Sequence, residues 1–184
     1  MLKNLRISIM LLLICGLAYP LVMTGISQLL MPEKAAGSII TNAEGNIIGS
    51  ELIGQKFTEP HYFNGRVSSI EYNASGSGSM NYAPTNKDMV ERTKTDLKLF
   101  LKNNPEVRQE DIPNDLLTNS GSGLDPHITK LAAQIQVPRI AQERGLSEAK
   151  LMNLIEDNTE SRQFNFIGEQ RINVLKLNIA LDQL

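Results

Sequence analysis

The sequence is poor in the residue types that most catalytic and metal centres need. Its 184 residues include one cysteine, Cys15, and two histidines, His61 and His127, and tryptophan is absent. A single cysteine excludes an intrachain disulfide framework and a thiolate metal cluster, and two histidines leave little for a zinc site. The net charge of −2 offers no basic footprint for nucleic acid. The length suits one domain with an appendage.

Charge is missing from one long stretch near the N-terminus. No charged residue lies between Arg6 and Glu33, and the stretch is mostly Ile, Leu, Met and Val. A helix over residues 7–31 would be about 37 Å long, enough to cross a hydrocarbon core about 30 Å thick. The sequence therefore predicts a transmembrane helix at residues 7–31, with residues 1–6 on one side of the membrane and residues 33–184 on the other.

A secretory signal peptide is the alternative interpretation of this stretch. Lys3 and Arg6 would form its basic start, and Gly16-Leu17-Ala18 resembles a cleavage site between small residues. However, Pro20 lies just beyond that site, and cleavage would leave an apolar stretch as far as Met31 on the mature chain. Both observations favour an uncleaved span.

Flanking charges predict the orientation of the span. Two basic residues precede it, whereas Glu33 and Lys34 follow it and cancel. Because basic residues are enriched on the cytoplasmic side of a membrane, we expect residues 1–6 in the cytoplasm and residues 33–184 outside. A domain outside the cell has no access to the cytoplasmic ATP pool.

Four small or polar residues recur at every fourth position of the predicted span, namely Gly16, Pro20, Thr24 and Gln28. Residues four apart share one face of a helix. Small residues permit close approach of a second helix, and polar ones can hydrogen-bond to it. Pro20 removes a backbone hydrogen bond and should kink the helix. This face predicts docking on a larger membrane partner; a plain anchor that tolerates a few polar residues is the alternative.

The chain after the span begins with a predicted β-hairpin and a long loop. The hairpin covers residues 38–49, where two isoleucine-rich segments flank a turn that ends in Gly45. Residues 72–86 are rich in Gly, Ser and Asn, which predicts a loop long enough to suggest a binding role. A helix is then predicted to start at a Thr85 cap and to end before Pro105.

The second half predicts helices followed by a strand. Asp125 is predicted to cap a helix whose first residue is a proline, with His127 in its first turn. That helix should kink or restart at Pro138 and end at Gly145, and Ser147 should cap the next one. The tail predicts a strand with a phase shift, or a strand that passes into a short helix. The predicted fold is an α+β soluble domain anchored by one N-terminal transmembrane helix.

Signals for nucleotide binding and catalysis are weak. The motifs GxxxxGK[ST], GxGxxG and GxSxG are absent. The Gly/Ser loop at residues 119–125 can offer backbone N–H groups to a phosphate, but it holds no basic residue, so a flexible loop is the alternative. Asp125 and His127 resemble an acid–base pair, although capping explains Asp125 better. We predict no catalytic residue and no metal ligand.

Two classes of function remain from the residues alone. The first is a single-span accessory subunit whose outer domain sits on a membrane partner. The second is a membrane-anchored extracytoplasmic ligand-binding module or enzyme. A dense cluster of reactive side chains would favour the second class, and the sequence shows none.

Seven short motifs lie in order along nearly the whole chain. They are Tyr19-Pro20; Gly49-Ser50-x-Leu52-Ile53-Gly54-Gln55-x-Phe57; Tyr62-Phe63-x-Gly65-Arg66; Ala74-Ser75-Gly76 with Pro84-Thr85-Asn86; Ser122-Gly123-Leu124-Asp125-Pro126-His127-Ile128; Gln136-Val137 with Arg139; and Asn173-Val174-Leu175-x-Leu177-Asn178-x-Ala180-Leu181-Asp182. Together they resemble the C subunit of the Kdp potassium-transporting P-type ATPases. Two departures are Val67, where a proline is usual, and Gly121, where an alanine is common.

The resemblance implies a non-catalytic accessory subunit, needed to assemble an ATP-driven high-affinity K⁺ uptake complex. Its partners would be the channel-like K⁺-translocating subunit and the ATP-hydrolysing subunit, within the lipid bilayer. This chain lacks the DKTG phosphorylation motif, so it is not the hydrolysing subunit. The family is also described as a catalytic chaperone that raises the ATP affinity of that subunit. By position, this implies ATP contacts at Ser120, Gly121, Ser122, Gly123 and Asp125, which conflicts with the orientation predicted from charge.

Overall fold

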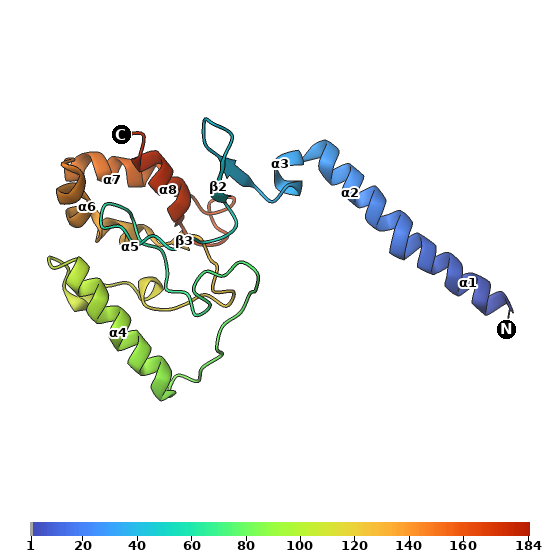
Figure 1. The fold of residues 1–184 in the computed structure, drawn as a ribbon, viewed down its shortest axis with the longest axis horizontal. Coiled ribbons are helices and arrows are strands. Elements are labelled where there is room, and N and C mark those ends of the chain that lie inside the picture. Colours follow the sequence, from blue (N-terminus) through green and yellow to red (C-terminus); the bar gives the residue numbers. More distant parts are fainter. Residues whose placement is uncertain (1) are drawn as a thin grey trace. The chain divides into compact units, whose positions relative to one another are not determined.

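The computed structural model describes residues 2–184, which form two compact units that divide between Ser50 and Glu51 (Figure 1). The first unit is a long helix followed by a β-hairpin, and the second combines helices with a small sheet. This arrangement confirms the predicted fold class, an α+β domain attached to one N-terminal apolar helix. The hairpin predicted at the start of the soluble domain belongs to the first unit.

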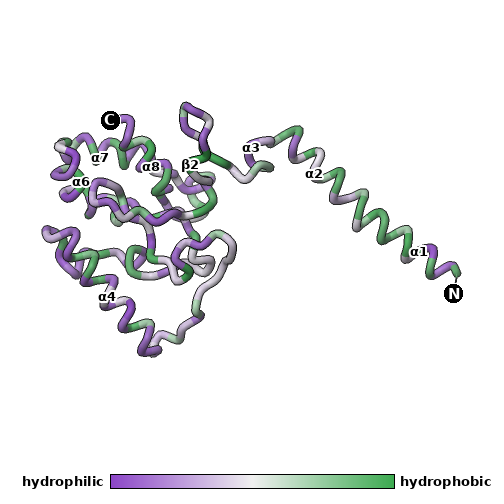
Figure 2. Tube along the Cα trace, viewed as in Figure 1, coloured by the Kyte–Doolittle hydropathy of each residue, from purple (hydrophilic) through white to green (hydrophobic). Residues whose placement is uncertain are grey.

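The N-terminal helix runs from Leu2 to Leu30. It consists of α1 (Leu2–Leu13), a π-helical segment η1 (Ile14–Ala18) and α2 (Tyr19–Leu30). Hydrophobic residues dominate it (Figure 2), and none of its side chains is buried. Among the described residues it is the one helix long and apolar enough to cross a membrane.

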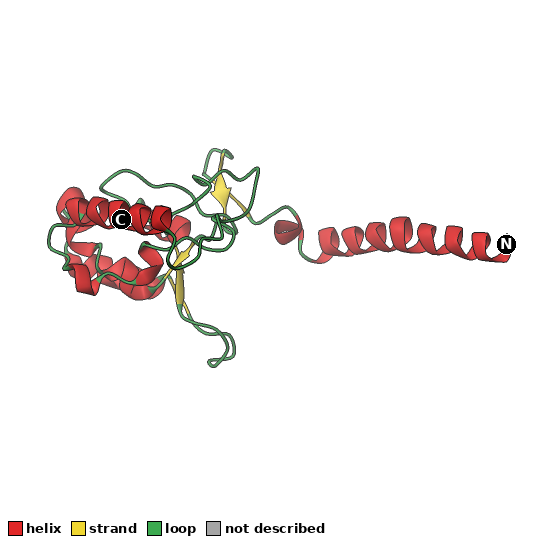
Figure 3. Cartoon of the chain, turned by 90° about the horizontal axis from the view of Figure 1, so that it is seen from below, coloured by secondary structure: helices red, strands yellow, loops and turns green. Residues whose placement is uncertain are grey.

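The π-helical segment ends at Ala18, two residues before Pro20. The Tyr19 N–H donates to the carbonyl of Ile14, five residues earlier, and Pro20 has no N–H to donate. A π turn takes up one extra residue without ending the helix. The helix therefore continues past the proline as one rod, visible in Figure 3, and the effect of Pro20 appears as a widened turn.

A β-hairpin closes the first unit. After the helical turn α3 (Pro32–Ala35) come the antiparallel strands β1 (Ile39–Thr41) and β2 (Ile47–Ser50). The Asn42 side chain accepts two backbone N–H groups within the turn, and Gly45 takes a φ of +84°, which glycine adopts readily. The Ser50 hydroxyl donates to the Gly37 carbonyl at 2.7 Å. The predicted hairpin is confirmed, and its two ends lie together.

The second unit contains the remaining helices and strands. They are α4 (Lys87–Asn103), α5 (Lys130–Gln134), α6 (Val137–Arg144), α7 (Glu148–Asp157) and α8 (Val174–Leu181), the 3-10 turns η2 (Gln109–Asp111) and η3 (Asn114–Leu116), and the strands β3 (His127–Ile128), β4 (Thr159–Glu160) and β5 (Arg171–Asn173). The sheet is antiparallel with the order β3-β5-β4. Strand β5 is central, with Ile172 opposite both Ile128 and Thr159.

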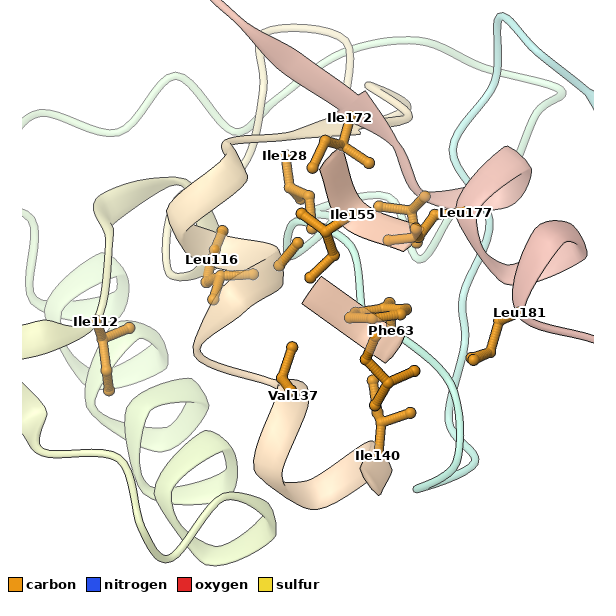
Figure 4. Packing of buried hydrophobic residues seen from close by; sticks show 14 residues of the cluster. Phe63, Ile112, Leu116, Ile128, Val137, Ile140, Ile155, Ile172, Leu177 and Leu181 are labelled. Atoms are coloured by element: carbon orange, nitrogen blue, oxygen red, sulfur yellow. The ribbon is translucent and has the colours of Figure 1, made fainter. Parts of the chain in front are cut away.

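The core of the second unit lies between this sheet and the helices. Ile128 and Ile172 from paired strands point toward Ile155 of α7 and Leu177 of α8 (Figure 4). Phe63 completes the cluster and is fully buried, although it comes from a segment without regular secondary structure. The fold therefore brings an irregular stretch of backbone into its interior.

The start of α4 differs from the prediction by one residue. Its N-cap is Asn86, whose side-chain oxygen accepts the Met89 N–H at 3.1 Å. Thr85 was predicted as the cap, and that prediction is wrong. The Asn86 N–H bonds to the Ala83 carbonyl, so Thr85 lies inside a turn that precedes the helix.

The predicted helix cap at Asp125 is also wrong. His127 and Ile128 form strand β3, where His127 pairs with Asn173 of β5, so His127 does not lie in a helical turn. The helix α5 begins later and is capped by Thr129, whose side chain accepts the Ala132 N–H. Pairing with a distant strand has overridden the local capping signal.

Other predicted boundaries are confirmed. Helix α6 restarts with Pro138 in its first turn, and Gly145 ends it in a left-handed conformation at a φ of +64°. Ser147 caps α7, and its side chain accepts the Lys150 N–H. Strand β5 passes directly into α8, as one of the two alternatives for the tail predicted.

Arg139 of α6 holds the irregular segment that carries Phe63. All five N–H groups of its guanidinium are used, because it donates to the carbonyls of Pro60 and Tyr62 and to the side-chain oxygens of Asn104, Asn64 and Gln136. Burial lowers the pKa of Arg139 to about 10, with Glu143 opposing the shift. The side chain therefore stays charged at neutral pH, and its hydrogen bonds join α6 to the irregular segment and to Asn104.

We predict that Arg139→Lys destabilises the second unit by about 2–4 kcal/mol, because a lysine has three donors and leaves buried acceptors unsatisfied. The midpoint of urea unfolding of the full chain in mild detergent, followed by circular dichroism, measures the effect. Arg108→Lys is the matched control, because Arg108 is largely exposed, and it should leave the midpoint unchanged. Equal midpoints for the two variants would contradict the assigned role.

Candidate functional site

Two glycine-containing loops that are distant in sequence meet in the second unit. The Gly78 N–H donates to the Ser122 carbonyl at 2.9 Å. The Ser68 hydroxyl donates to the Gly123 carbonyl at 2.6 Å. We call residues 68–78 together with residues 119–125 the glycine-loop site. The sequence predicted loops at residues 72–86 and 119–125, and the structure joins the start of the first predicted loop to the second.

In the second loop, two serine side chains hydrogen-bond to backbone N–H groups of the same loop. The Ser120 hydroxyl oxygen accepts the N–H groups of Gly123 at 2.9 Å and Asp125 at 3.4 Å. The Ser122 hydroxyl oxygen accepts the Leu124 N–H at 3.1 Å. A phosphate cradle needs backbone donors that point at the ligand. Three successive donors here point into the loop, so the two serines stabilise its shape.

Two glycines of the second unit occupy positions without room for a side chain. Gly123 has a φ of +70°, and a Cβ there would lie 2.9 Å from Ile70. A Cβ on Gly54 would lie 2.8 Å from the Asp125 carbonyl oxygen, because the Gly54 N–H donates to the neighbouring Leu124 carbonyl. At Gly121 a Cβ would meet nothing within 4 Å.

Asp125 is the electrostatic centre of the site. Its Oδ2 lies 3.1 Å from Nη1 of Arg66, and its Oδ1 accepts the His127 backbone N–H at 3.0 Å and lies 3.2 Å from the His127 ring Nδ1. Hydrogen bonding from His127 lowers the pKa of Asp125, and Arg66 adds to the shift, whereas burial opposes it. The carboxylate is therefore ionised at neutral pH and already engaged by side chains of this chain.

Sequence reasoning missed the pairing of Arg66 with Asp125, because the two residues are separated by 59 positions. Both residues belong to the motifs that carry the family resemblance. Arg66 also contacts Tyr72, whose hydroxyl donates to the Arg66 carbonyl. Burial raises the pKa of Tyr72 to about 12. Joint membership in these motifs was the signal that could have suggested the contact.

The four residues of the predicted docking face lie in the N-terminal helix, with Gly16 in η1 and Pro20, Thr24 and Gln28 in α2. All four are exposed. In a regular α-helix, residues four positions apart are rotated by ~40° around the helix axis. The four side chains would therefore move gradually around the helix and away from a single face. The π turn at η1 takes up an extra residue and offsets part of that drift. A Cβ on Gly16 would meet nothing within 4 Å.

One cavity of the second unit is lined by residues outside the glycine-loop site. It has a volume of about 400 Å³ and is lined by residues that include Pro60, Asn104 and Arg139. Its size suits a small ligand, but Arg139 already donates every N–H to the protein. Within residues 2–184, no three His, Cys, Asp or Glu side chains gather where they can hold a metal ion.

Taken together, these features define a membrane-anchored protein with one apolar helix and a small α+β domain whose glycine loops are fixed by hydrogen bonds and one ion pair. The chain belongs to the KdpC family. A family model described as "K+-transporting ATPase, c chain" matches residues 1–183, so the resemblance seen in the seven motifs is confirmed.

Curated relatives agree with the family model. The potassium-transporting ATPase KdpC subunit of Bacillus cereus is 51% identical over 179 residues, which cover 97% of this chain and 93% of the relative. The KdpC subunit of Clostridioides difficile is 47% identical over 198 aligned positions, covering 98% and 95% of the two chains. The similarity therefore includes both the helix and the domain.

We predict that Gly123→Ala destabilises the second unit by about 2–4 kcal/mol, since alanine is strained at this φ and its methyl group would clash with Ile70. Gly121→Ala is the matched control in the same loop and should change the free energy of unfolding by less than about 0.5 kcal/mol. Urea unfolding of both full-length variants measures the difference. An undisturbed Gly123→Ala protein would show that the loop is not held as described.

Proposed function

We propose that this chain is the non-catalytic, single-span subunit of an ATP-driven potassium uptake complex and that it is needed for assembly of that complex. Membership of the KdpC family carries the proposal, because the family model spans both the helix and the domain. Its partners are the channel-like K⁺-translocating subunit and the ATP-hydrolysing subunit. The alternative class, a self-sufficient extracytoplasmic binding module or enzyme, has no comparable support.

The helix supports an assembly role. Its side chains are unburied within the chain, and Gly16, Pro20, Thr24 and Gln28 combine small size with hydrogen-bonding capacity. Helices in lipid associate through close packing at small residues and through interhelical hydrogen bonds, since lipid tails offer no hydrophobic driving force. This face docks on a helix of the channel-like subunit, with the lipid bilayer around the rest.

The domain lies outside the cytoplasm in this proposal. Lys3 and Arg6 precede the apolar helix, whereas Glu33 and Lys34 cancel after it, and positive charge favours the cytoplasmic side. From that position the domain covers the K⁺ entrance of the channel-like subunit. The glycine-loop site then contacts the outer surface of that subunit.

The catalytic-chaperone role is the second candidate, and it needs the opposite orientation. It would bring Ser120, Gly121, Ser122, Gly123 and Asp125 to the nucleotide of the hydrolysing subunit. The internal hydrogen bonds of the loop and the Arg66–Asp125 pair favour a structural role over phosphate binding. The side of the membrane on which the loop lies separates the two candidates.

We predict that the glycine loop is labelled from outside the cell. In a Cys15→Ala background, Gly121→Cys places one thiol at an exposed position with open space, and intact cells are treated with a membrane-impermeant thiol reagent. Asn4→Cys, which keeps Lys3 and Arg6, is the matched control and should react only after lysis. Protection of Gly121→Cys until lysis would overturn the proposed orientation and make the chaperone role the leading one.

We predict that Gly16→Leu with Thr24→Leu lowers recovery of the partner subunits about tenfold, because the larger side chains block close helix packing and remove a hydrogen bond. Co-purification from cells that express the whole complex measures recovery. Cys15→Leu with Gly25→Leu is the matched control, since both positions lie off that face and a Cβ on Gly25 also meets nothing within 4 Å. Equal recovery from both double variants would remove the helix face from the proposal.

A further inference from the structure

The hairpin between β4 and β5 carries an exposed aromatic tip. It extends from the helices of the second unit as the long loop at the bottom of Figure 3. At its end, the Phe164 and Phe166 side chains are 83% and 73% exposed, and Ile167 is 48% exposed. Solvent-exposed clusters of large apolar residues mark binding surfaces for proteins or membranes. We call residues 163–168 the hairpin tip.

The tip is held in a defined shape. Gln163 and Ile167 exchange two backbone hydrogen bonds of 2.9 Å, and the rings of Phe164 and Phe166 lie side by side with centroids 6.4 Å apart. Phe164 has a φ of +51°, which is a strained conformation for a bulky residue. Asn165 also has a positive φ of +66°, and two such residues form the tight turn that closes a β-hairpin.

The charges around the tip cancel. No charged residue lies within residues 163–168. Just behind it, Arg162 pairs with Glu169 at 2.8 Å, and Arg171 pairs with Glu160 at 2.9 Å. The tip is thus uncharged and apolar, and the two ion pairs behind it carry no net charge. These properties suit the interface of a zwitterionic bilayer, where apolar groups enter the acyl boundary and ion pairs stay among the headgroups.

The short segment between the membrane helix and residue 51 limits how far the second unit can lie from the bilayer. From Met31, at the end of the membrane helix, to Gly37 the chain spans roughly 15 Å, because α3 shortens it. The Ser50 hydroxyl then bonds to the Gly37 carbonyl, so residue 51 lies about 20–25 Å from the end of the helix at most. This limit follows from connectivity and holds for any angle between the two units.

The base of the hairpin is fixed at this same point. The Asn173 side chain, at the end of β5, donates to the Glu51 carbonyl at 2.8 Å, and Lys176 pairs with the Glu51 carboxylate at 3.0 Å. From Asn173 to the tip the hairpin is about 26 Å long. The hairpin is therefore long enough to span the greatest distance that the tether allows between its base and the end of the helix.

We propose that the hairpin tip inserts into the interface of the bilayer that holds the N-terminal helix and forms a second membrane contact for the domain. The contact goes beyond the assembly role and applies on either side of the membrane. It takes zwitterionic phospholipid and needs no anionic headgroup. A second contact limits rotation of the domain about its short tether.

Fluorescence quenching by lipid tests the proposal on the full-length chain. In a Cys15→Ala background, Gln163→Cys carries an environment-sensitive fluorophore, and the protein is reconstituted in phosphatidylcholine vesicles with brominated acyl chains. We expect quenching about threefold or more above that of the same probe at Lys94→Cys, an exposed position on α4. Equal quenching at the two positions would overturn the proposal.

A tip variant separates insertion from mere proximity. Phe164→Ser with Phe166→Ser should reduce quenching at position 163 to the level at position 94, because the apolar contact is lost. Leu99→Ser with Leu131→Ser changes two apolar side chains elsewhere, which are 56% and 52% exposed, and should leave quenching unchanged. Both double variants alter exposed positions, and circular dichroism checks their fold.

The assembled complex gives the remaining outcome. If the probe at position 163 shifts to the blue but is not quenched by brominated lipid, the tip rests on a protein surface of a partner subunit. That result overturns the lipid contact. Quenching in both the isolated chain and the complex supports it.

Discussion

The fold of the second unit depends on how it satisfies the backbone of an irregular segment in its interior. Phe63 is fully buried, yet no strand or helix pairs with its peptide groups. The Asn178 side chain does so, accepting the Phe63 N–H at 2.9 Å and donating to the Phe63 carbonyl at 3.0 Å. Gln136 and Arg139 serve the neighbouring residues in the same way. Buried polar groups without such partners would destabilise the domain.

This constraint explains what the family motifs encode. Gln136, Arg139 and Asn178 are motif residues with buried side chains. Asn178 bonds to the backbone of Phe63 itself, and the other two bond to the residues on either side of it. Asn173 ties the sheet to the start of the unit at Glu51. In this chain these motif residues therefore form a polar framework in the core. Asn, Gln and Arg residues in a motif need not indicate catalysis when their side chains hydrogen-bond to backbone groups.

Local signals predicted the fold well where the chain interacts with itself over short distances. The hairpin at β1 and β2, the end of α6 at Gly145 and the Ser147 cap follow from turn and capping chemistry. Asp125 shows the limit, because its capping signal was real but pairing of His127 with Asn173 decided the conformation. The meeting of Gly78 with Ser122 depends on distant contacts, which no local pattern contains.

The candidate functional surfaces are those that the polar framework leaves free. Asp125 and the serines of the glycine loop form hydrogen bonds and an ion pair within the protein. The loop is therefore suited to present a fixed surface and poorly suited to change its shape around a ligand. By contrast, Gly16 and Phe164 are exposed, and neither is needed for the core. The assembly role that we propose would therefore depend on these exposed surfaces. Within the second unit, Asn173 of this framework fixes the base of the hairpin that carries Phe164, whereas Gly16 belongs to the first unit.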